Sequence, residues 1–113
     1  MEKKNKKPSR ESKSTLYIAQ HKGLSEYYKI GCTNDLDKRI QTLDTGSPTG
    51  ITILFHIKNK YAYLIEQTVL KHFNNYQSNL EWFKMSKEEY KKMQEYILML
   101  IEQCKDYDQR KEQ

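Results

Sequence analysis

Cysteine is scarce in this sequence, which has only two among 113 residues. Cys32 and Cys104 lie far apart and fit no spacing that is typical of a metal site. We therefore expect free thiols rather than a disulfide, in the cytoplasm or another reducing intracellular compartment.

Long apolar runs are also missing. No stretch approaches the roughly 18 consecutive apolar residues that a membrane-spanning helix needs, so we expect no membrane partner. The N-terminal segment is charged and lacks the apolar centre of a secretory signal. A chain of 113 residues is long enough for one domain with a modest core.

Excess positive charge is scarce outside the N-terminus, although the formal net charge of the chain is +5. Residues 1–14 hold six basic and two acidic side chains, so this segment carries +4 and the rest of the chain only +1. We predict a disordered basic arm over residues 1–14, which either binds a polyanion or only improves solubility. The candidate DNA-binding side chains of the arm are Lys3, Lys4, Lys6, Lys7 and Arg10.

Three segments have the alternating, β-branched and aromatic character of strands. Residues 15–20 and 26–31 flank a short loop that contains a glycine, which predicts an antiparallel hairpin. Residues 51–58 predict a third strand, whose apolar side is expected to be Ile51, Ile53, Phe55 and Ile57.

The two faces of the predicted hairpin differ in character. One face is expected to be apolar and to consist of Leu16, Ile18, Tyr28 and Ile30. The other face is expected to hold Tyr17, Tyr27 and Lys29. A slip of one residue would exchange the two sets, so this pairing is a specific prediction of the register.

Three further segments have the apolar spacing of amphipathic helices. The first follows the candidate N-cap residues 33–35 and places Arg39 at the margin of a buried stripe formed by Leu36, Ile40 and Leu43. The second spans about residues 61–73 and places Glu66 in the middle of its apolar face. The third begins with a capping box from Ser86 to Glu89.

This order of elements predicts an α/β fold of the α+β kind, with a three-stranded antiparallel sheet and flanking helices. We expect one domain over residues 15–105, which includes the C-terminal helix, and a frayed tail over residues 106–113.

Four polar side chains fall where core residues would be expected, namely Tyr17, Lys29, Arg39 and Glu66. One interpretation is a structural ion pair between Arg39 and Glu66 that packs against tyrosines. The other is a catalytic cluster, because a carboxylate can hold a hard divalent cation and an arginine can stabilise a phosphoryl group. A nearby tyrosine or lysine can accept or relay the proton of an attacking water.

Several short motifs resemble the GIY-YIG nuclease superfamily, over about residues 15–85. LYI (16–18) stands as the first motif, KIG (29–31) as the second and EWF (81–83) as the closing motif. Arg39 follows Gly31 at the spacing of the family's arginine, and Glu66 matches its metal-binding glutamate. The chain resembles the small viral and bacterial members with a KIG motif, and this resemblance is compatible with a virus- or phage-encoded protein.

The resemblance implies an α/β sandwich and a metal-dependent endonuclease that hydrolyses DNA phosphodiester bonds in one in-line step. It implies that Glu66 holds one Mg²⁺ or Mn²⁺ and that Arg39 stabilises the phosphoryl charge. Tyr17 would act as the base, Lys29 would orient water or phosphate, and Lys38 would contact the DNA backbone.

Four positions depart from the family pattern: Thr15 replaces a glycine, Lys29 replaces a tyrosine, and Leu43 and Leu70 replace histidines. The alternative is therefore a catalytically degenerate domain that binds DNA or a protein partner without cleavage. A structural adaptor that acts through the last helix is a third interpretation. A protein partner would supply targeting, and the sequence leaves open a monomer or a dimer through that helix.

Overall fold

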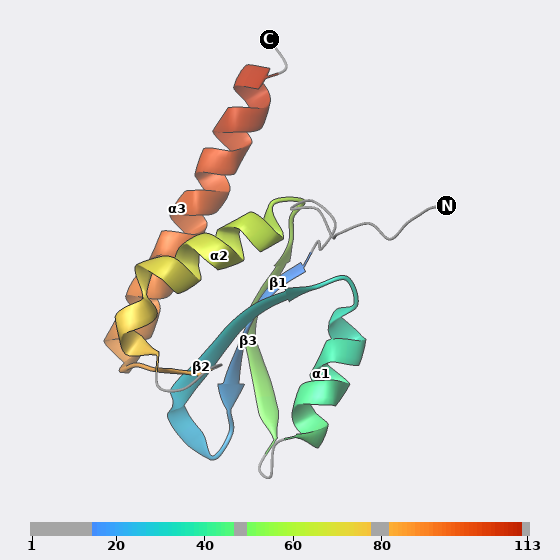
Figure 1. Cartoon of the computed structure of the whole chain (residues 1–113), viewed down its shortest axis with the longest axis vertical. Helices are drawn as coiled ribbons and strands as arrows, with labels where there is room; N and C mark the ends of the chain where they lie inside the picture. The colour runs from blue at the N-terminus through green and yellow to red at the C-terminus, as the bar shows by residue number, and fades with distance from the viewer. Residues whose placement is uncertain (1–14, 47–49, 78–81, 112–113) are drawn as a thin grey trace.

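The computed structural model describes residues 15–46, 50–77 and 82–111 (Figure 1). The elements are, in chain order, β1 Thr15–His21, β2 Leu24–Thr33, α1 Leu36–Thr45, β3 Ile51–Lys58, α2 Ala62–His72, the 3₁₀ turn η1 Asn74–Tyr76, β4 Phe83–Lys84 and α3 Lys87–Lys111. The predicted basic arm, with its candidate DNA-binding residues, lies outside the described residues. No helix among the described residues has both the length and the apolar character needed to cross a membrane.

The sheet has four antiparallel strands in the order β3-β1-β2-β4. The α+β class is confirmed, but the predicted count of three strands is wrong by one. β4 pairs with Tyr27 and Tyr28 of β2, and the Met85 N–H donates to the Glu26 carbonyl at 2.9 Å. A strand of two residues is too short to show a period in the sequence, so β4 is defined by its pairing in the folded sheet.

The predicted register of the β1–β2 hairpin is confirmed. Ile18 lies opposite Ile30, and Tyr17 lies opposite Gly31. Because directly paired residues share a face, the apolar set faces one helical layer, and Tyr17 and Lys29 face the other. The hairpin therefore already sorts core side chains from candidate site side chains.

The prediction for β3 is wrong in one respect, because its apolar residues do not all share one side. A β-bulge between Ile18 and Ala19 shifts the pairing, so that Ile18 pairs with Phe55 whereas Ala19 pairs with Ile53. The extra residue on β3 reverses the side to which the following residues point. Phe55 and Ile57 consequently pack against the larger core, and Ile51 and Ile53 belong to the smaller one.

The helices form layers on opposite faces of the sheet (Figure 1). α2 and α3 cover the face that holds the larger core. α1 lies on the other face, over a small cluster of Tyr17, Ala19 and Ile51. The stripe predicted for α1 is only half-buried, and no residue of that helix is fully buried. A small partner cluster leaves too little apolar surface to bury a whole helix face.

α3 begins with the predicted capping box. The Ser86 N–H donates to Glu89 Oε1 at 2.8 Å, and the Glu89 N–H donates to Ser86 Oγ at 3.1 Å. The helix continues to Lys111, past residue 106, where the sequence predicts a frayed tail. Asp108 explains part of this extension, because it accepts a hydrogen bond of 2.6 Å from the Tyr61 hydroxyl and lies 3.5 Å from Lys60 Nζ.

Candidate functional site

A polar cleft of about 440 Å³ brings together the four candidate catalytic residues. Tyr17 comes from β1, Lys29 from β2, Arg39 from α1 and Glu66 from α2. The remaining lining residues are consecutive at the end of β2 and in the turn that follows: Ile30, Gly31, Cys32, Thr33, Asn34 and Asp35. Residues from four elements therefore converge on one cleft.

The cleft extends across β2 from one face of the sheet to the other. Tyr17 and Lys29 lie on the face covered by α1, whereas Cys32 pairs with Leu16 and faces α2. On β2, β4 pairs with Tyr27 and Tyr28, so it does not extend along the part of β2 that lines the cleft. Glu66 on α2 and Arg39 on α1 can therefore line the same cleft, although their helices cover opposite faces.

The turn between β2 and α1 is held by local hydrogen bonds. The Asp35 N–H donates to Thr33 Oγ1 at 3.1 Å, and Asp35 Oδ1 accepts from the Lys38 N–H at 3.1 Å as the helix N-cap. The Arg39 N–H donates to the Asp35 carbonyl at 3.1 Å. Arg39 is thus placed one helical turn after a capped and well-bonded start.

Tyr17 and Arg39 contact each other directly. Arg39 Nε donates a hydrogen bond of 3.0 Å to the Tyr17 hydroxyl oxygen. The tyrosine is buried, and its ring lies so close to Gly31 that a Cβ at this glycine would come within 2.5 Å of the hydroxyl oxygen. Only glycine leaves room for the ring at this place in β2.

The surroundings of Tyr17 have opposing effects on the pKa of its phenol. Burial raises the pKa of the Tyr17 phenol above its ordinary value of 10.0. The hydrogen bond and the charge of Arg39 lower this pKa in part, and the negative charge of Glu66 raises it. The net shift is upward. The phenol is therefore protonated in most molecules near neutral pH.

Glu66 is half-buried and borders the apolar face of α2 between buried Ile65 and exposed Gln67. The fully buried residues of α2 are Ala62, Ile65 and Val69, and Glu66 lies beside them, one turn before Leu70, which is half-buried against the same core. Glu66 Oε1 accepts hydrogen bonds from Cys32 Sγ at 3.5 Å and from Gln67 Nε2 at 3.2 Å. Neither of these two contacts involves Arg39, the partner of Glu66 in the structural ion pair that is one interpretation of the sequence.

Lys29 is the one charged side chain that is classed as buried in the described part of the chain, with 8% of its surface exposed. It lies opposite Ala19 on the α1 side of the sheet and lines the cleft with Tyr17 and Arg39. Burying an ammonium group is unfavourable unless partners compensate its charge. Its position makes Lys29 part of the cleft wall.

Metal ligation in this cleft would rest on Glu66. The described residues contain no group of three or more His, Cys, Asp or Glu side chains arranged to hold a metal ion. A Mg²⁺ ion, however, is commonly held by one or two carboxylates, waters and substrate phosphates rather than by a full protein cage. The oxygen donors present, with the Glu66 carboxylate in a cleft also lined by Thr33 and Asn34, fit such a hard cation.

Sequence reasoning missed two features of the cleft. Cys32 was expected only to be a free thiol, which it is, but it also contacts Glu66. Asp35 lines the cleft as well as capping α1. Side chains alternate along β2, so Cys32 faces α2 as Ile30 does. The sequence pattern is therefore sufficient to predict the face of the sheet on which the thiol lies.

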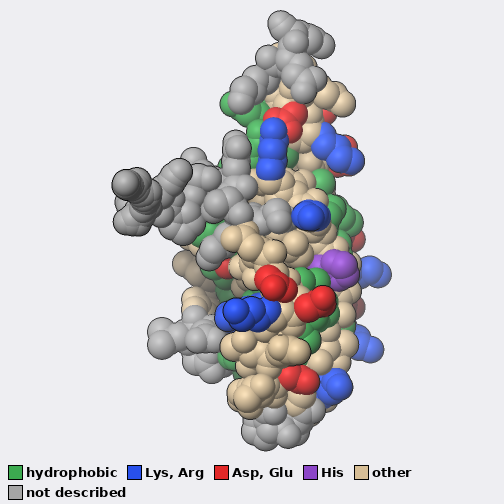
Figure 2. All heavy atoms as spheres, turned by 90° about the vertical axis from the view of Figure 1, so that its right-hand side faces the viewer, with side chains coloured by type: hydrophobic (Ala, Val, Ile, Leu, Met, Phe, Trp, Pro, Cys, Tyr) green, Lys and Arg blue, Asp and Glu red, His purple; other side chains and the backbone are tan. Residues whose placement is uncertain are grey.

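The other predicted residues are distributed around the cleft. Lys38 is exposed on α1 and does not line it. Of the closing motif, Phe83 is buried in the larger core, and Trp82 packs half-buried against the smaller cluster. Figure 2 shows the side of the molecule that carries α1, where acidic and basic side chains are interspersed. Any phosphate-binding surface in this view must therefore be local.

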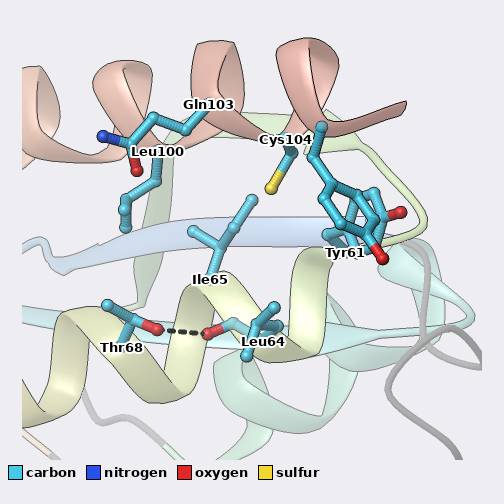
Figure 3. Close-up of a pocket in the computed structure, with 8 residues that line it drawn as sticks. Tyr61, Leu64, Ile65, Thr68, Leu100, Gln103 and Cys104 are labelled. Carbon is cyan, nitrogen blue, oxygen red and sulfur yellow. Dashed lines mark hydrogen bonds between the residues drawn. The ribbon is translucent and has the colours of Figure 1, made fainter. Parts of the chain in front are cut away.

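A second concave region, here named the apolar groove, lies between α2 and α3 (Figure 3). Its volume is about 490 Å³, and it is lined by Tyr61, Leu64, Ile65, Thr68, Leu100, Gln103, Cys104 and Tyr107. The Cys104 sulfur points from α3 toward α2 in this view. None of the lining side chains is charged near neutral pH, so the groove lacks the groups that phosphoryl chemistry needs.

Comparison with known proteins identifies one family. The family model described as the T5orf172 domain matches residues 14–98. This range includes all four candidate catalytic residues of the polar cleft. No curated protein and no solved structure gave a significant match.

Proposed function

The chain belongs to the T5orf172 domain family, and we propose that it is a metal-dependent endonuclease that hydrolyses DNA phosphodiester bonds. The observation that carries this proposal is the convergence of Tyr17, Lys29, Arg39 and Glu66 in one cleft. These residues supply a base, two cations and a carboxylate, which are the groups that a single in-line displacement at phosphorus requires. Assignment to the GIY-YIG superfamily, on the LYI and KIG motifs, is part of the proposal.

Arg39 would stabilise the negative charge that develops on the phosphoryl oxygens. Its Nε already donates to the Tyr17 hydroxyl, which orients the guanidinium toward the cleft. The remaining N–H groups of a guanidinium can bind phosphate oxygens in a forked geometry. Arg39 would therefore hold the scissile phosphate beside the tyrosine.

Tyr17 would accept the proton of the attacking water. As the phenolate, its oxygen takes the proton while the water oxygen forms a bond to phosphorus. The bond from phosphorus to the leaving oxygen breaks, and that oxygen departs with the bonding electrons and takes a proton from solvent water. The adjacent Arg39 cation favours the phenolate, although burial opposes it. A phenol with a raised pKa is a strong base once deprotonated, and the reaction would accelerate as pH rises.

Lys29 would orient phosphate or water from the β2 wall of the cleft. Its ammonium group is a compact donor of three hydrogen bonds, and the residue as a whole is buried. An anionic substrate in the cleft would lie beside this positive charge. The same feature supports the degenerate alternative, because a buried cation in place of a tyrosine can bind phosphate without chemistry.

Glu66 would hold one Mg²⁺ or Mn²⁺ ion through its carboxylate. Such an ion neutralises phosphate charge and lowers the pKa of bound water. The protein supplies the placement of the carboxylate, which α2 fixes across β2 from Tyr17 and Arg39.

DNA contacts outside the cleft would come from Lys38 and the basic arm. The slope of log affinity against log salt is negative, and its magnitude grows with the number of phosphate contacts. If all six basic groups of residues 1–14 touch phosphates, deletion of the arm should reduce that magnitude by roughly 5 for duplex DNA. Salt-dependent binding measured by fluorescence anisotropy tests this. An unchanged slope would assign the arm to solubility alone.

The proposal is tested by a cleavage screen of plasmid, single-stranded and branched DNAs with Mg²⁺ and with Mn²⁺. Wild type and Glu66→Ala are assayed side by side, and circular dichroism verifies that both are folded. We expect cleavage by wild type and none by the variant. DNA binding by both proteins without cleavage by either would support the degenerate alternative instead, and a protein partner would then be sought.

A further inference from the structure

Cys32 contacts the candidate metal ligand, yet the mechanism proposed above assigns the thiol no role. We propose that Cys32 is a positioning residue, whose thiol orients the Glu66 carboxylate for a divalent cation in the polar cleft. This inference rests on the proposed function, because it concerns the metal ligand of that site. It assigns a second residue of β2, next to Gly31, to the support of the site.

The contact joins two elements that are distant in the sequence. Cys32 lies near the end of β2 and faces α2, because it pairs with Leu16 on the apolar side of the hairpin. Glu66 follows Ile65, which is buried in the core between α2 and the sheet. The S–H donor and the carboxylate are therefore held by two rigid elements that pack on each other.

The hydrogen bonds of Glu66 are distributed unevenly over its two oxygens. Cys32 Sγ and Gln67 Nε2 both donate to Oε1, at 3.5 Å and 3.2 Å. Within the described residues, no hydrogen bond or ion pair of Glu66 involves Oε2. A carboxylate anchored by one oxygen keeps its other oxygen available for a cation, as in many metal sites whose ligands are oriented by neighbouring donors.

The two donors do not contribute equally. The contact with Gln67 is exposed, so water competes with it, and it involves the next residue on the same helix. The contact with Cys32 is partly buried and comes from the sheet. Only Cys32 therefore fixes the carboxylate relative to β2, which also positions Lys29 and packs against Tyr17 through Gly31.

Cys104 provides a matched control. It is also a half-buried free thiol, but it lies on α3 and lines the apolar groove rather than the polar cleft. If thiols in this protein only fill space, removal of either one should have the same small effect on stability and no effect on metal binding. If Cys32 positions Glu66, the two substitutions differ.

The experiment measures Mn²⁺ binding directly, by the electron paramagnetic resonance signal of free Mn²⁺, for wild type, Cys32→Ala, Cys32→Ser, Cys104→Ala and Glu66→Ala. We expect the Kd for Mn²⁺ to rise by about tenfold or more in Cys32→Ala, the range typical for loss of an orienting partner. Cys32→Ser keeps a donor of nearly the same shape and should restore most of the affinity. Cys104→Ala should bind Mn²⁺ like wild type.

Cleavage assays add a second measurement. In Cys32→Ala the Mg²⁺ concentration that gives half the maximal rate should rise more than the maximal rate falls, because excess metal compensates for a poorly oriented ligand. Thermal melting of each variant shows that all are folded at the assay temperature.

Two results would overturn the inference: Mn²⁺ binding that Cys32→Ala leaves unchanged, or wild-type Mn²⁺ binding that is absent or insensitive to Glu66→Ala. The proposed function fails separately. If wild type binds Mn²⁺ through Glu66 but cuts no DNA, the nuclease proposal is wrong, and the effect of Cys32→Ala on Mn²⁺ affinity still decides the role of the thiol.

Discussion

The polar cleft and the apolar groove are both lined by residues of α2 and have similar volumes, about 440 Å³ and 490 Å³. Glu66 lines the cleft, whereas Leu64, Ile65 and Thr68 line the groove. The cleft also holds Lys29, Arg39 and Asp35, and the groove holds no charged lining residue. Size therefore does not distinguish the two regions.

One helix, α2, contributes both to the core beside the apolar groove and to the polar cleft. The groove side of α2 packs toward α3, so its apolar side chains contribute to stability. On the cleft side, burial opposes ionisation of Tyr17, and Lys29 places a charged side chain at a buried position. Such features are typical of functional sites, which often sacrifice stability for function. Substitutions in the cleft should therefore change activity more than stability, and substitutions in the groove should do the reverse.

The largest expected effect concerns Glu66→Gln, which keeps the shape of the side chain and removes its charge. Cleavage should fall by at least about 100-fold because the carboxylate is the proposed metal ligand, while the melting temperature shifts only slightly. Glu102→Gln on α3 is the control, since that glutamate is exposed, lies outside the cleft and pairs with Lys105. A large fall in melting temperature with cleavage intact would instead show that Glu66 is part of a structural ion pair.

The second expected effect concerns pH. If the Tyr17 phenolate is the base, the cleavage rate should rise by about tenfold per pH unit and continue to rise through pH 10, because the pKa of Tyr17 is raised. Tyr17→Phe should abolish this dependence. Tyr90→Phe is the control, because the pKa of Tyr90 is also raised by burial but its ring stacks on Tyr28 in the core.

The raised pKa values of Tyr17 and Tyr90 also predict how the free energy of unfolding depends on pH. A raised folded-state pKa means that the protonated form is favoured by folding, so this contribution is complete below about pH 10 and is lost as pH rises above it. Urea unfolding at pH 8 and above pH 10 should show a smaller loss of stability with pH in Tyr17→Phe and in Tyr90→Phe than in wild type. Only Tyr17→Phe should also change the pH dependence of cleavage.

A smaller effect, on both activity and stability, is expected for Gly31→Ala. The new Cβ would lie 2.5 Å from the Tyr17 hydroxyl oxygen, so the ring must move. Overpacking of this kind typically costs about 1–3 kcal/mol, and loss of the Tyr17 position should lower cleavage as well. Gly46→Ala serves as the control, because the nearest atom to its Cβ would be 3.7 Å away. Equal melting temperatures for both variants would contradict this packing argument.

The smallest effect is expected at the edge of the groove. Tyr61→Phe removes the hydrogen bond of 2.6 Å to Asp108 and should lower the free energy of unfolding by about 1 kcal/mol. Cleavage at saturating substrate should not change, since Tyr61 lies outside the cleft. A change in cleavage without a change in stability would show that the groove, too, takes part in function.

Much of the fold could be predicted because its signals are local. The hairpin register follows from alternation over a few residues, and it correctly placed Tyr17 and Lys29 on the face opposite the larger core. The capping box at Ser86 and the start of α1 after Asp35 follow from side chains within three residues of the backbone groups that they bind. The four candidate residues could be named, but not the contacts that they make.

The sequence by itself determined the period of each long element, the helix starts and the separation of apolar from polar faces, because these depend on neighbours along the chain. Tertiary structure alone decided the bulge that divides β3, the two-residue strand β4 and the contact between Cys32 and Glu66. It also decided that Tyr17 packs over Gly31 and that its hydroxyl oxygen accepts a hydrogen bond from Arg39. Each of these depends on how close two distant segments come, and that distance is set by packing of the whole core rather than by any local pattern.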